Sequence, residues 1–355
     1  MHLILVINPG STSTKVAVFE DEDGVALKTY RHSFNELKEY VRVIDQIDFR
    51  LNLVRSFLEE HSFCLADFSA IVGVGGLIKP VSGGTYLVNE KMLDDLKIGL
   101  QGEHPSNLGG ILGYKLASQV GIPAYIVDPV VVDELDELAR ISGIPEIKRR
   151  SIFHALNQKA IGRRAAYLLG KDYKEVNLVI AHLGGGISVG AHCQGKVIDV
   201  NNALDGDGPF TPERSGGVPV GDLVRLCFSG QFDKSEVLKK ITGQGGLVAY
   251  LGTNSAQEVE SRINDGDSIA QFIYEAMIYQ VAKEIGCMAT VLKGKVDAII
   301  LTGGLSRSKY VINNLKERVS YISNVIVYSG EDEMKALAEG VLRVLRGEEE
   351  TKGYV

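Results

Sequence analysis

A short run of hydroxyl-bearing residues near the N-terminus ends in a lysine, and these residue types could hold an anion. The run extends from Asn8 to Lys15 (NPGSTSTK) and stands between two apolar segments that predict buried strands. Glycine lets backbone N–H groups approach an oxyanion, while Ser11, Ser13 and Lys15 would supply hydroxyl donors and a positive charge. Taken alone, the run is more typical of a solvated hairpin turn with an exposed lysine.

Two further glycine-rich loops follow apolar runs later in the chain. One follows residues 176–181 and reads HLGGG from His182, and the other follows residues 297–301 and reads TGG from Thr302. The first belongs to a succession of strand, turn, strand, turn and strand that repeats the order of residues 3–33. This internal repeat predicts two related halves, each of which contributes one loop to a shared site.

Composition and charge exclude several classes of function. The chain has 355 residues, of which 45% are hydrophobic and 23% charged, with a formal net charge of −7. Its length favours two domains, and without a polybasic tract neither nucleic acid nor an anionic membrane is an expected partner. Neither G-x-x-x-x-G-K-[ST] nor G-x-G-x-x-G occurs, which argues against a P-loop and against a dinucleotide site.

Cysteine usage and the first residues indicate the compartment. Cys64, Cys193, Cys227 and Cys287 stand far apart without a C-x-x-C pair, so we expect buried free thiols rather than a zinc site or disulfides. The N-terminus shows neither a signal-peptide pattern nor a basic leader, and no apolar run reaches transmembrane length. A cytoplasmic protein is expected.

The spacing of apolar residues predicts the helices that position these loops. Predicted helices cover residues 37–58, 131–142, 151–169 and 269–288, and a last helix opens at residues 330–333 and ends near residue 345. The first of them follows a Ser33-x-x-Glu36 capping box. The acidic residues 348–350 after the last helix are expected to be disordered.

The basic residues Lys148, Arg149 and Arg150 mark the predicted boundary between two domains. The predicted N-terminal domain comprises residues 1–150 completed by residues 331–355. The predicted second domain comprises residues 151–330 and carries most of the nucleotide site.

Several motifs resemble those of the short-chain fatty acid kinases, the acetokinase family. The run from Asn8 to Lys15 resembles the family's N-x-G-S-[ST]-S-x-K signature, and the loop from His182 resembles its H-L-G-N-G loop. The resemblance continues through His104-Pro105-x-Asn107-Leu108, Asp128, Phe153-His154, Phe210-Thr211-Pro212 with Arg214, Gly303-Gly304 and Glu331. It implies an α/β fold of two similar ribonuclease-H-like (actin-like ATPase) domains, each a mixed sheet flanked by helices, with a cleft between them.

The resemblance also implies an activity and a role for each residue. ATP with Mg²⁺ would phosphorylate the carboxylate of a short-chain fatty acid by direct in-line transfer. Arg214 would clamp the transferred phosphoryl group and His182 would donate to its oxygens, while Asn8 would orient the phosphates and Asp128 would align the substrate. The other implied residues are Ser11, Ser13, Lys15, Gly184, Gly185 and Gly186 for phosphate, Gly303 and Gly304 for adenosine, Val74, His104 and His154 on the substrate side, and Glu331 for Mg²⁺ through water.

The chain also departs from the family pattern. An arginine is expected just before the glycine pair of the third strand, but the chain reads Gly73-Val74-Gly75-Gly76, with Lys79 as the nearest cation. Gly185 replaces the usual asparagine. The resemblance implies butyrate as the substrate, with acetate, propionate and branched acids as alternatives, and less bulk near the acid fits a longer acyl chain. The resemblance further implies a homodimer or a higher homo-oligomer.

Each candidate residue also has a structural interpretation. His182 could be an ordinary half-buried histidine, Arg214 could pair with Asp205 or Asp207, and Asp128 could initiate a turn. Glu331 would suit a helix N-terminus, and His104 and His154 could be scaffold residues. From another class of function, an actin-like or chaperone-like ATP-driven clamp would share the fold but would form no acyl phosphate.

Overall fold

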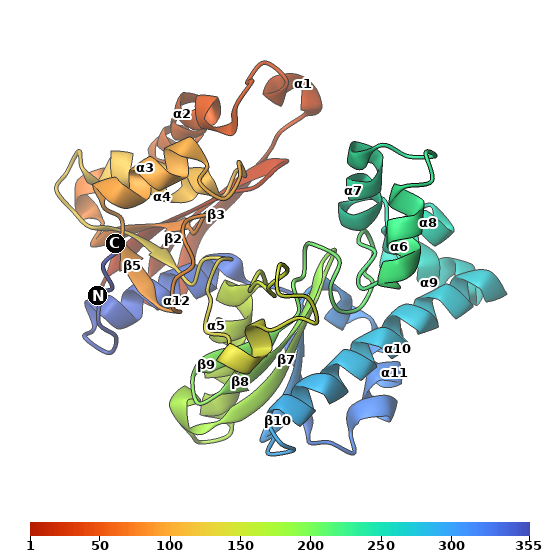
Figure 1. The fold of residues 1–355 in the computed structure, drawn as a ribbon. Coiled ribbons are helices and arrows are strands. Elements are labelled where there is room, and N and C mark those ends of the chain that lie inside the picture. The colour runs from red at the N-terminus through yellow and green to blue at the C-terminus, as the bar shows by residue number, and fades with distance from the viewer. The chain divides into compact units, whose positions relative to one another are not determined.

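The structure, a computed structural model, describes residues 1–355 except for the side chain of Phe34 (Figure 1). The chain divides into two compact units. The first unit comprises Met1–Val132 and Asp332–Val355, and the second comprises Asp133–Glu331. Residues 133–150, which the sequence prediction assigned to the first domain, therefore belong to the second unit.

The first unit is built on a mixed sheet with the strand order β3-β2-β1-β4-β6-β5. Its strands are β1 (Leu3–Pro9), β2 (Ser13–Glu20), β3 (Asp23–Arg31), β4 (Ala70–Val74), β5 (Thr85–Leu87) and β6 (Ala124–Val127). Strands β1, β4 and β6 run parallel, whereas β1, β2 and β3 form antiparallel hairpins. The apolar runs of β1 and β4 are buried on both faces, as the sequence predicted.

Helices cover both faces of this sheet (Figure 1). They are α1 (Phe34–Leu37), α2 (Ile47–Glu60), α3 (Glu90–Ile98), α4 (Asn107–Ala117) and α12 (Glu333–Leu345), with 3₁₀ turns at Val43–Gln46 and Leu65–Asp67. Val54 and Phe57 of α2 pack in one core with Leu5 of β1, and α12 covers the opposite face. A Cβ atom on Gly73 would come within 2.0 Å of the carbonyl oxygen of Gly109, so the backbones of β4 and α4 touch.

The single helix predicted over residues 37–58 is wrong. The capping box is present, because Ser33 N donates to Glu36 Oε2 at 2.7 Å and Glu36 N donates to Ser33 Oγ at 3.3 Å, but α1 ends at Leu37. The chain regains helical structure only after Arg42 and Val43 have bound the carboxylate of Glu103, at 2.6 and 3.1 Å. This long-range ion pair outweighs a local preference for continuous helix.

The expected disorder after α12 is also wrong. Glu349 binds Arg343 at 2.9 Å and accepts a hydrogen bond from Thr85 N at 3.0 Å. Lys352 forms a β-bridge with Tyr86, and Tyr354 is buried with its hydroxyl 2.7 Å from Asp95 Oδ2. The last residues therefore belong to the core of the first unit.

The second unit repeats the sheet plan with the strand order β11-β10-β7-β8-β9. Its strands are β7 (Asn177–Leu183), β8 (Ile187–Cys193), β9 (Lys196–Val200), β10 (Ala298–Thr302) and β11 (Val325–Val327). Strand β7 pairs antiparallel with β8 and parallel with β10, just as β1 pairs with β2 and β4. This correspondence confirms the internal repeat.

The helices of the second unit flank its sheet and extend beyond it (Figure 1). They are α5 (Ala155–Leu168), α6 (Val220–Cys227), α7 (Lys234–Thr242), α8 (Gly246–Leu251), α9 (Ala256–Asn264), α10 (Ser268–Val291) and α11 (Lys309–Val319), with 3₁₀ turns at Glu137–Arg140, Tyr173–Glu175 and Gly304–Arg307. Met277 and Val281 of α10 pack with Val179 on one face of the sheet. Ile161 of α5 packs with Ile180 on the other.

The helix predicted over residues 131–142 is wrong. Apart from the 3₁₀ turn at Glu137–Arg140, the segment is not helical. Asp136 N donates to Ile198 O at 2.9 Å, and Arg140 pairs with Asp133 at 2.7 Å. The contact with Ile198 attaches the segment to β9. Val131, Val132 and Leu135 are buried without helical structure, whereas Leu138 and Ile141 are exposed.

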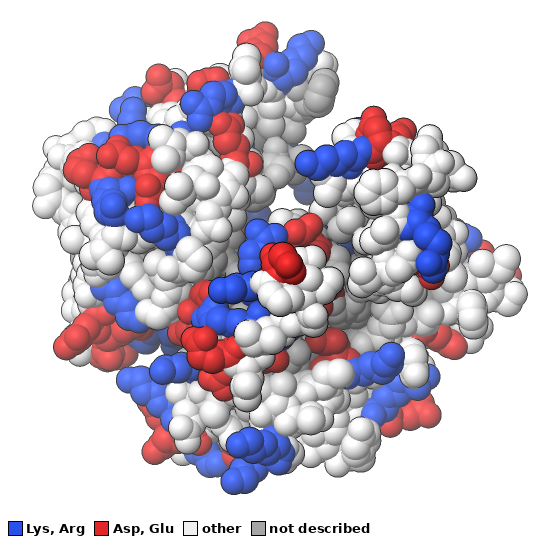
Figure 2. Space-filling model, in the orientation of Figure 1, with Lys and Arg blue, Asp and Glu red and all other residues white. Residues whose placement is uncertain are grey.

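Two surface properties complete the fold. Among the residues that the structure describes, no helix is both long and apolar enough to span a membrane. All four cysteines are free, but the expectation that they are buried is wrong, because Cys64, Cys227 and Cys287 are exposed. On the face shown in Figure 2, acidic and basic side chains are interspersed, as on an ordinary solvated surface.

Candidate active site

The turn from Asn8 to Lys15 joins β1 to β2, as the sequence predicted. Gly10 N donates to Ser13 O at 2.8 Å and closes the turn. Ser11 is exposed, and Ser13 and Lys15 are partly exposed. The hydroxyls and the ammonium group are therefore available to an anion from solution.

The carboxyl ends of β1, β4 and β6 place three predicted residues at one edge of the first sheet. Asn8, Val74 and Asp128 lie at or directly after these parallel, neighbouring strands. Open α/β sheets bind ligands beyond this edge. The sequence could predict the edge because each residue ends an apolar run.

Asp128 has a strained backbone and an anchored side chain. Its φ angle is +37°, which non-glycine residues rarely adopt, and its side chain is buried. Asp128 Oδ1 accepts a hydrogen bond from Gly84 N at 2.7 Å. Such strain concentrates at functional sites, but the Gly84 contact equally supports the structural interpretation as a turn residue.

A carboxylate that the sequence analysis missed lies beside Asn8. Asn8 Nδ2 donates to Glu333 Oε2 at 2.7 Å, and Glu333 occupies the first turn of α12. Glu331, the predicted metal residue, lies instead in the second unit, where its Oε2 is 3.9 Å from His182 Nε2. Because residues 331–333 are all acidic, the sequence alone did not indicate which of them lies beside Asn8.

The structure offers few protein ligands for a metal ion. In the described part of the chain, no cluster of three or more His, Cys, Asp or Glu side chains could hold one. Asn8 and Glu333 nevertheless supply an amide and a carboxylate, the oxygen ligands that Mg²⁺ accepts. Mg²⁺ also retains several waters and takes its remaining ligands from phosphates, so this small donor set fits it.

His104 is a neutral hydrogen-bonded residue at the start of α4. Its Nδ1 accepts a hydrogen bond from Ser106 N at 3.2 Å and lies 2.8 Å from Ser106 Oγ. Burial, followed by the charge of Arg50, lowers the pKa of His104. Because Nδ1 is an acceptor, the proton of the neutral ring is on Nε2.

In the second unit, neighbouring parallel strands bring the two remaining glycine loops together. Thr302 of β10 stands opposite His182 of β7 in the register. Gly303 has a φ angle of +89°, and a Cβ atom there would lie 2.5 Å from Leu183 O. A side chain at position 303 would therefore separate the two loops, while Gly304 opens the adjoining 3₁₀ turn.

Two histidine rings are stacked at the carboxyl end of β7. The ring centroids of His154 and His182 are 3.8 Å apart with an interplanar angle of 10°. Burial lowers the pKa of both rings, and the charge of Arg214 contributes at His154, whose pKa falls to about 3. Both rings are therefore neutral near pH 7.

Behind His154 runs a chain of buried hydrogen bonds that fixes its tautomer. Gln158 Nε2 donates to Ser188 O at 3.0 Å and to Ser188 Oγ at 2.8 Å, which defines the orientation of the amide. Ser188 is fully buried and its Oγ lies 2.9 Å from His154 Nδ1, so the hydroxyl proton has that nitrogen as its acceptor. His154 consequently carries its own proton on Nε2.

The same chain continues to His192 and Tyr173. Gln158 Oε1 accepts from His192 Nε2 at 2.9 Å, and the Tyr173 hydroxyl lies 2.6 Å from His192 Nδ1. No sequence signal pointed to these residues, because buried polar side chains in α5 and β8 resemble ordinary core positions until their partners are known. The His182 ring has a separate partner, with Nδ1 lying 2.8 Å from Asn157 Oδ1.

The lowered pKa of His154 predicts acid destabilisation. The pKa is about 3 in the folded chain and about 6.5 for an unperturbed histidine, so between these pH values the unfolded chain binds more protons. The contribution of His154 to the free energy of unfolding is therefore fully present above pH 6.5 and is lost as the pH falls toward 3. We expect the contribution of His154 to lower the free energy of unfolding, measured with urea, by about 2 kcal/mol between pH 7 and pH 5. In His154→Gln the difference should shrink by that amount; an unchanged pH dependence would contradict the assignment.

Arg214 lies in the glycine- and proline-rich loop after β9, where the sequence predicted irregular structure. Its Nη1 donates to Ala203 O, but its buried Nε has no hydrogen-bond partner among the described residues. Burial lowers the pKa of Arg214. A buried N–H without an acceptor is costly, so the guanidinium is suited to an incoming anion.

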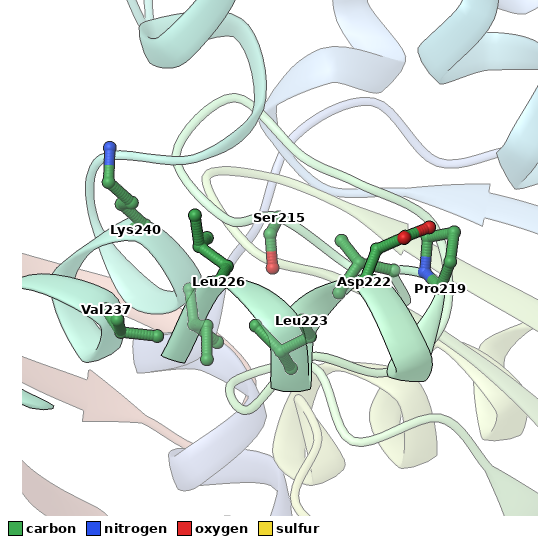
Figure 3. Close-up of a pocket in the computed structure, with 9 residues that line it drawn as sticks. Ser215, Pro219, Asp222, Leu223, Leu226, Val237 and Lys240 are labelled. Atoms are coloured by element: carbon green, nitrogen blue, oxygen red, sulfur yellow. The ribbon is translucent and has the colours of Figure 1, made fainter. Parts of the chain in front are cut away.

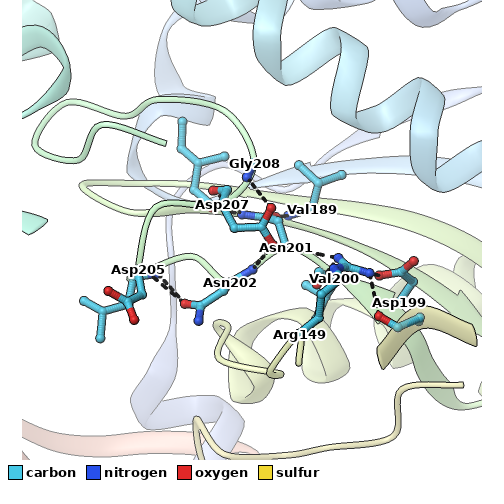
Figure 4. A network of polar contacts seen from close by, with 12 residues as sticks. Arg149, Val189, Asp199, Val200, Asn201, Asn202, Asp205, Asp207 and Gly208 are labelled. Atoms are coloured by element: carbon cyan, nitrogen blue, oxygen red, sulfur yellow. Dashed lines mark hydrogen bonds and ion pairs between the residues drawn. The ribbon is translucent and has the colours of Figure 1, made fainter. Parts of the chain in front are cut away.

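The alternative in which Arg214 pairs with Asp205 or Asp207 is wrong. Asp205 pairs with Arg150 at 3.0 Å. Asp207 accepts from Asn202 N at 3.0 Å and lies 3.8 Å from Arg149, in the polar network of Figure 4. Both carboxylates are engaged in holding the loop.

The Arg214 loop and the loop from His182 are in direct contact. Thr211 Oγ1 donates to Gly185 O at 2.6 Å. A Cβ atom on Gly186 would come within 2.1 Å of Arg214 Nη1. The structure thus brings together His154, His182, the three glycines and Arg214 in the second unit.

A pocket of about 340 Å³ lies between α6 and α7 (Figure 3), and Ser215, the residue after Arg214, contributes to its lining. Its lining is mainly apolar and consists of Ser215, Val218, Pro219, Asp222, Leu223, Leu226, Val237, Lys240 and Ile241. None of the sequence-predicted site residues lines it. Its apolar walls do not suit a polyphosphate.

Two mixed sheets of matching strand order, each with glycine-rich loops at the carboxyl ends of its strands, define an actin-like ATPase fold. Acetate kinase from Porphyromonas gingivalis has a similar structure, with a TM-score of 0.81, 19% identity and coverage of 97% of this chain and 100% of that chain. Propionate kinase from Francisella tularensis gives a TM-score of 0.76 at 20% identity, covering 96% and 99%.

Sequence comparison identifies the family. The model of the acetokinase family matches residues 144–323. The chain is 56% identical over 354 residues to butyrate kinase 1 of Clostridium acetobutylicum, covering 100% of both chains. It is 57% identical over 351 residues to butyrate kinase 2 of the same organism, covering 99% of both. The chain belongs to the acetokinase family.

Proposed function

We propose that this chain transfers the γ-phosphoryl group of ATP to butyrate, giving butyryl phosphate and ADP. The observation that carries the proposal is Arg214, whose buried Nε lacks an acceptor in the described chain and whose Nη1 lies against the glycine loop after His182. Identities of 56% and 57% to two butyrate kinases over nearly the full chain support this acid as the substrate.

The chemistry requires positive charge and hydrogen-bond donors rather than a base. A carboxylate is already ionised at neutral pH, so no proton has to be removed before it attacks phosphorus. Phosphoryl transfer then depends on positioning and on neutralising the oxygens of the transferred group. We assign these tasks to the Arg214 guanidinium and to the neutral histidine pair.

Of the two histidines, we assign the donor role first to His154. The Ser188 contact places its proton on Nε2, whereas the Asn157 carbonyl opposite His182 Nδ1 favours a proton on that nitrogen. His182 then supports His154 through ring stacking. This differs from the expectation that His182 itself donates.

Roles in the first unit follow the same proposal. Ser11, Ser13 and Lys15 would hold phosphates, with Asn8 orienting them and Asp128 aligning the acid. Mg²⁺, bound with the help of Asn8 and Glu333, would neutralise phosphate charge, and Glu331 would act through water. Gly303 and Gly304 would accept the adenosine.

Acid preference can be measured by trapping the acyl phosphate as its hydroxamate. Across acetate, propionate, butyrate, valerate and isobutyrate, we expect the highest kcat/KM with butyrate and losses of roughly 10- to 200-fold per methylene removed. The physical reason is that an apolar pocket gains only about 1–3 kcal/mol from each methylene. Fastest turnover of acetate would rule out the butyrate assignment, and absence of any acyl phosphate would favour an ATP-driven clamp.

A cytoplasmic location and a homodimer or higher homo-oligomer are part of the same proposal. The assembly rests on resemblance to the family, and the location rests on the cysteine usage described above. Sedimentation equilibrium of the purified protein measures the assembly, and a monomer at micromolar concentration would contradict it.

A further inference from the structure

Arg50 of α2 is a fully buried cation directly behind the turn from Asn8 to Lys15. Its side chain has 0% exposure. Nη2 donates to Gly10 O at 3.0 Å, and Nη1 donates to Ser13 O at 3.0 Å and to Thr14 Oγ1 at 2.9 Å. Gln46 Oε1 accepts from Nε at 3.1 Å and from Nη2 at 2.9 Å. The guanidinium thus fixes the backbone of the turn.

Every one of these acceptors is uncharged. No acidic side chain in the part of the chain that the structure describes forms an ion pair with Arg50, and burial alone lowers its pKa to about 10. Arg50 is therefore still a cation at neutral pH. Its charge also contributes to the lowered pKa values of His32 and His104, and a histidine ring, which is either neutral or positive, cannot supply a counter-charge.

A buried charge without a counter-ion is unfavourable, and a carboxylate in place of the Gln46 amide would supply a counter-ion. We propose that the counter-ion of Arg50 is the polyphosphate chain of the nucleotide, and that Arg50 is a positioning residue which both shapes the turn and attracts the phosphates through it. This inference rests on the proposed role of the turn in binding phosphate. It adds Arg50 as a second cation to the motif from Asn8 to Lys15, which itself contains Lys15.

The alternative is that Arg50 only holds the turn by hydrogen bonds. Gln46→Glu separates the two, because a carboxylate can accept the same two hydrogen bonds while neutralising the guanidinium. Gln119→Glu is the matched control, since it adds the same charge at an exposed position near the end of α4, where Gln119 contacts Lys115 O.

The measurement is calorimetric binding of ADP and of adenosine to the full chain at low and moderate salt. We expect Gln46→Glu to weaken ADP binding about tenfold and to reduce its salt dependence, since one unit charge is neutralised close to the phosphates. Adenosine, which has no phosphate, should bind as in the wild type, and Gln119→Glu should change neither ligand. Unaltered ADP affinity in folded Gln46→Glu, or equal losses of ADP and adenosine, would overturn the proposal.

A second pair of variants covers the case in which Gln46→Glu does not fold. Arg50→Lys keeps the charge but loses the fork of donors, whereas Arg50→Met loses both. The proposal expects Arg50→Lys to retain more ADP affinity than Arg50→Met, and equal losses would contradict it. These are binding measurements, so a wild-type chain that binds ADP but forms no acyl phosphate would refute the proposed reaction without affecting this test.

Discussion

Replacing Arg214 with alanine is expected to lower kcat about a thousandfold while changing KM for ATP less than about threefold. The Arg214 Nε is buried and lacks an acceptor in the described chain, so an anion that arrives there gains a charge-assisted hydrogen bond. Charge spreads over the equatorial oxygens of the transferred group during the reaction, so this contact should strengthen in the transition state. Steady-state hydroxamate assays at varied ATP measure both constants.

Arg214→Lys is the matched control for this prediction. Lysine keeps the charge but cannot reproduce the planar fork, so we expect an intermediate loss of kcat. Thermal unfolding of both variants shows that the fold is retained. An effect confined to KM would contradict the role assigned to Arg214.

Adding one methyl group at Gly186 is expected to lower kcat by about a hundredfold. A Cβ atom there would come within 2.1 Å of Arg214 Nη1, well inside any permitted contact, so the guanidinium must move. A displacement of about 1 Å in a positioning group is enough for a loss of this size. The same hydroxamate assay applied to Gly186→Ala gives the result.

Gly185→Ala provides a neighbouring control in the same loop. Its new Cβ would meet the carboxylate of Glu213 at 3.8 Å, an ordinary contact, so a loss below about tenfold is expected. In an Arg214→Ala background, Gly186→Ala should have little further effect, because the group it displaces is absent. Additive losses in the double variant would show that Gly186 acts independently of Arg214.

Much of the fold was predictable because its strands are long apolar runs that end at glycine or polar residues. The hairpin repeat, the loops from His182 and Thr302, and the long helix α10 are all confirmed. The errors arose where distant partners determine the structure. Glu103 binds residues 42–43 and divides the predicted first helix, and β9 holds residues 133–140 out of a helical conformation.

The candidate site was predictable to a similar extent. Strand ends located Asn8, Asp128 and His182, and the glycine- and proline-rich loop located Arg214, but their roles stay predictions. Glu333, Arg50 and the hydrogen-bonded residues behind His154 escaped notice because their significance depends on side-chain neighbours far away in the sequence. A single arginine in an amphipathic helix is ordinary until its acceptors are seen to be backbone carbonyls of the turn from Asn8 to Lys15, which we propose binds phosphate.

The first unit contains residues from both ends of the chain, and this affects how it can fold during biosynthesis. Residues 133–331 are contiguous and can fold as they leave the ribosome, whereas Thr85 and Tyr86 must wait for Glu349 and Lys352 to be synthesised. The sheet that carries the turn from Asn8 is therefore expected to be completed last. A nascent chain is therefore expected to complete the unit that holds His154 and Arg214 before the unit that holds Asn8.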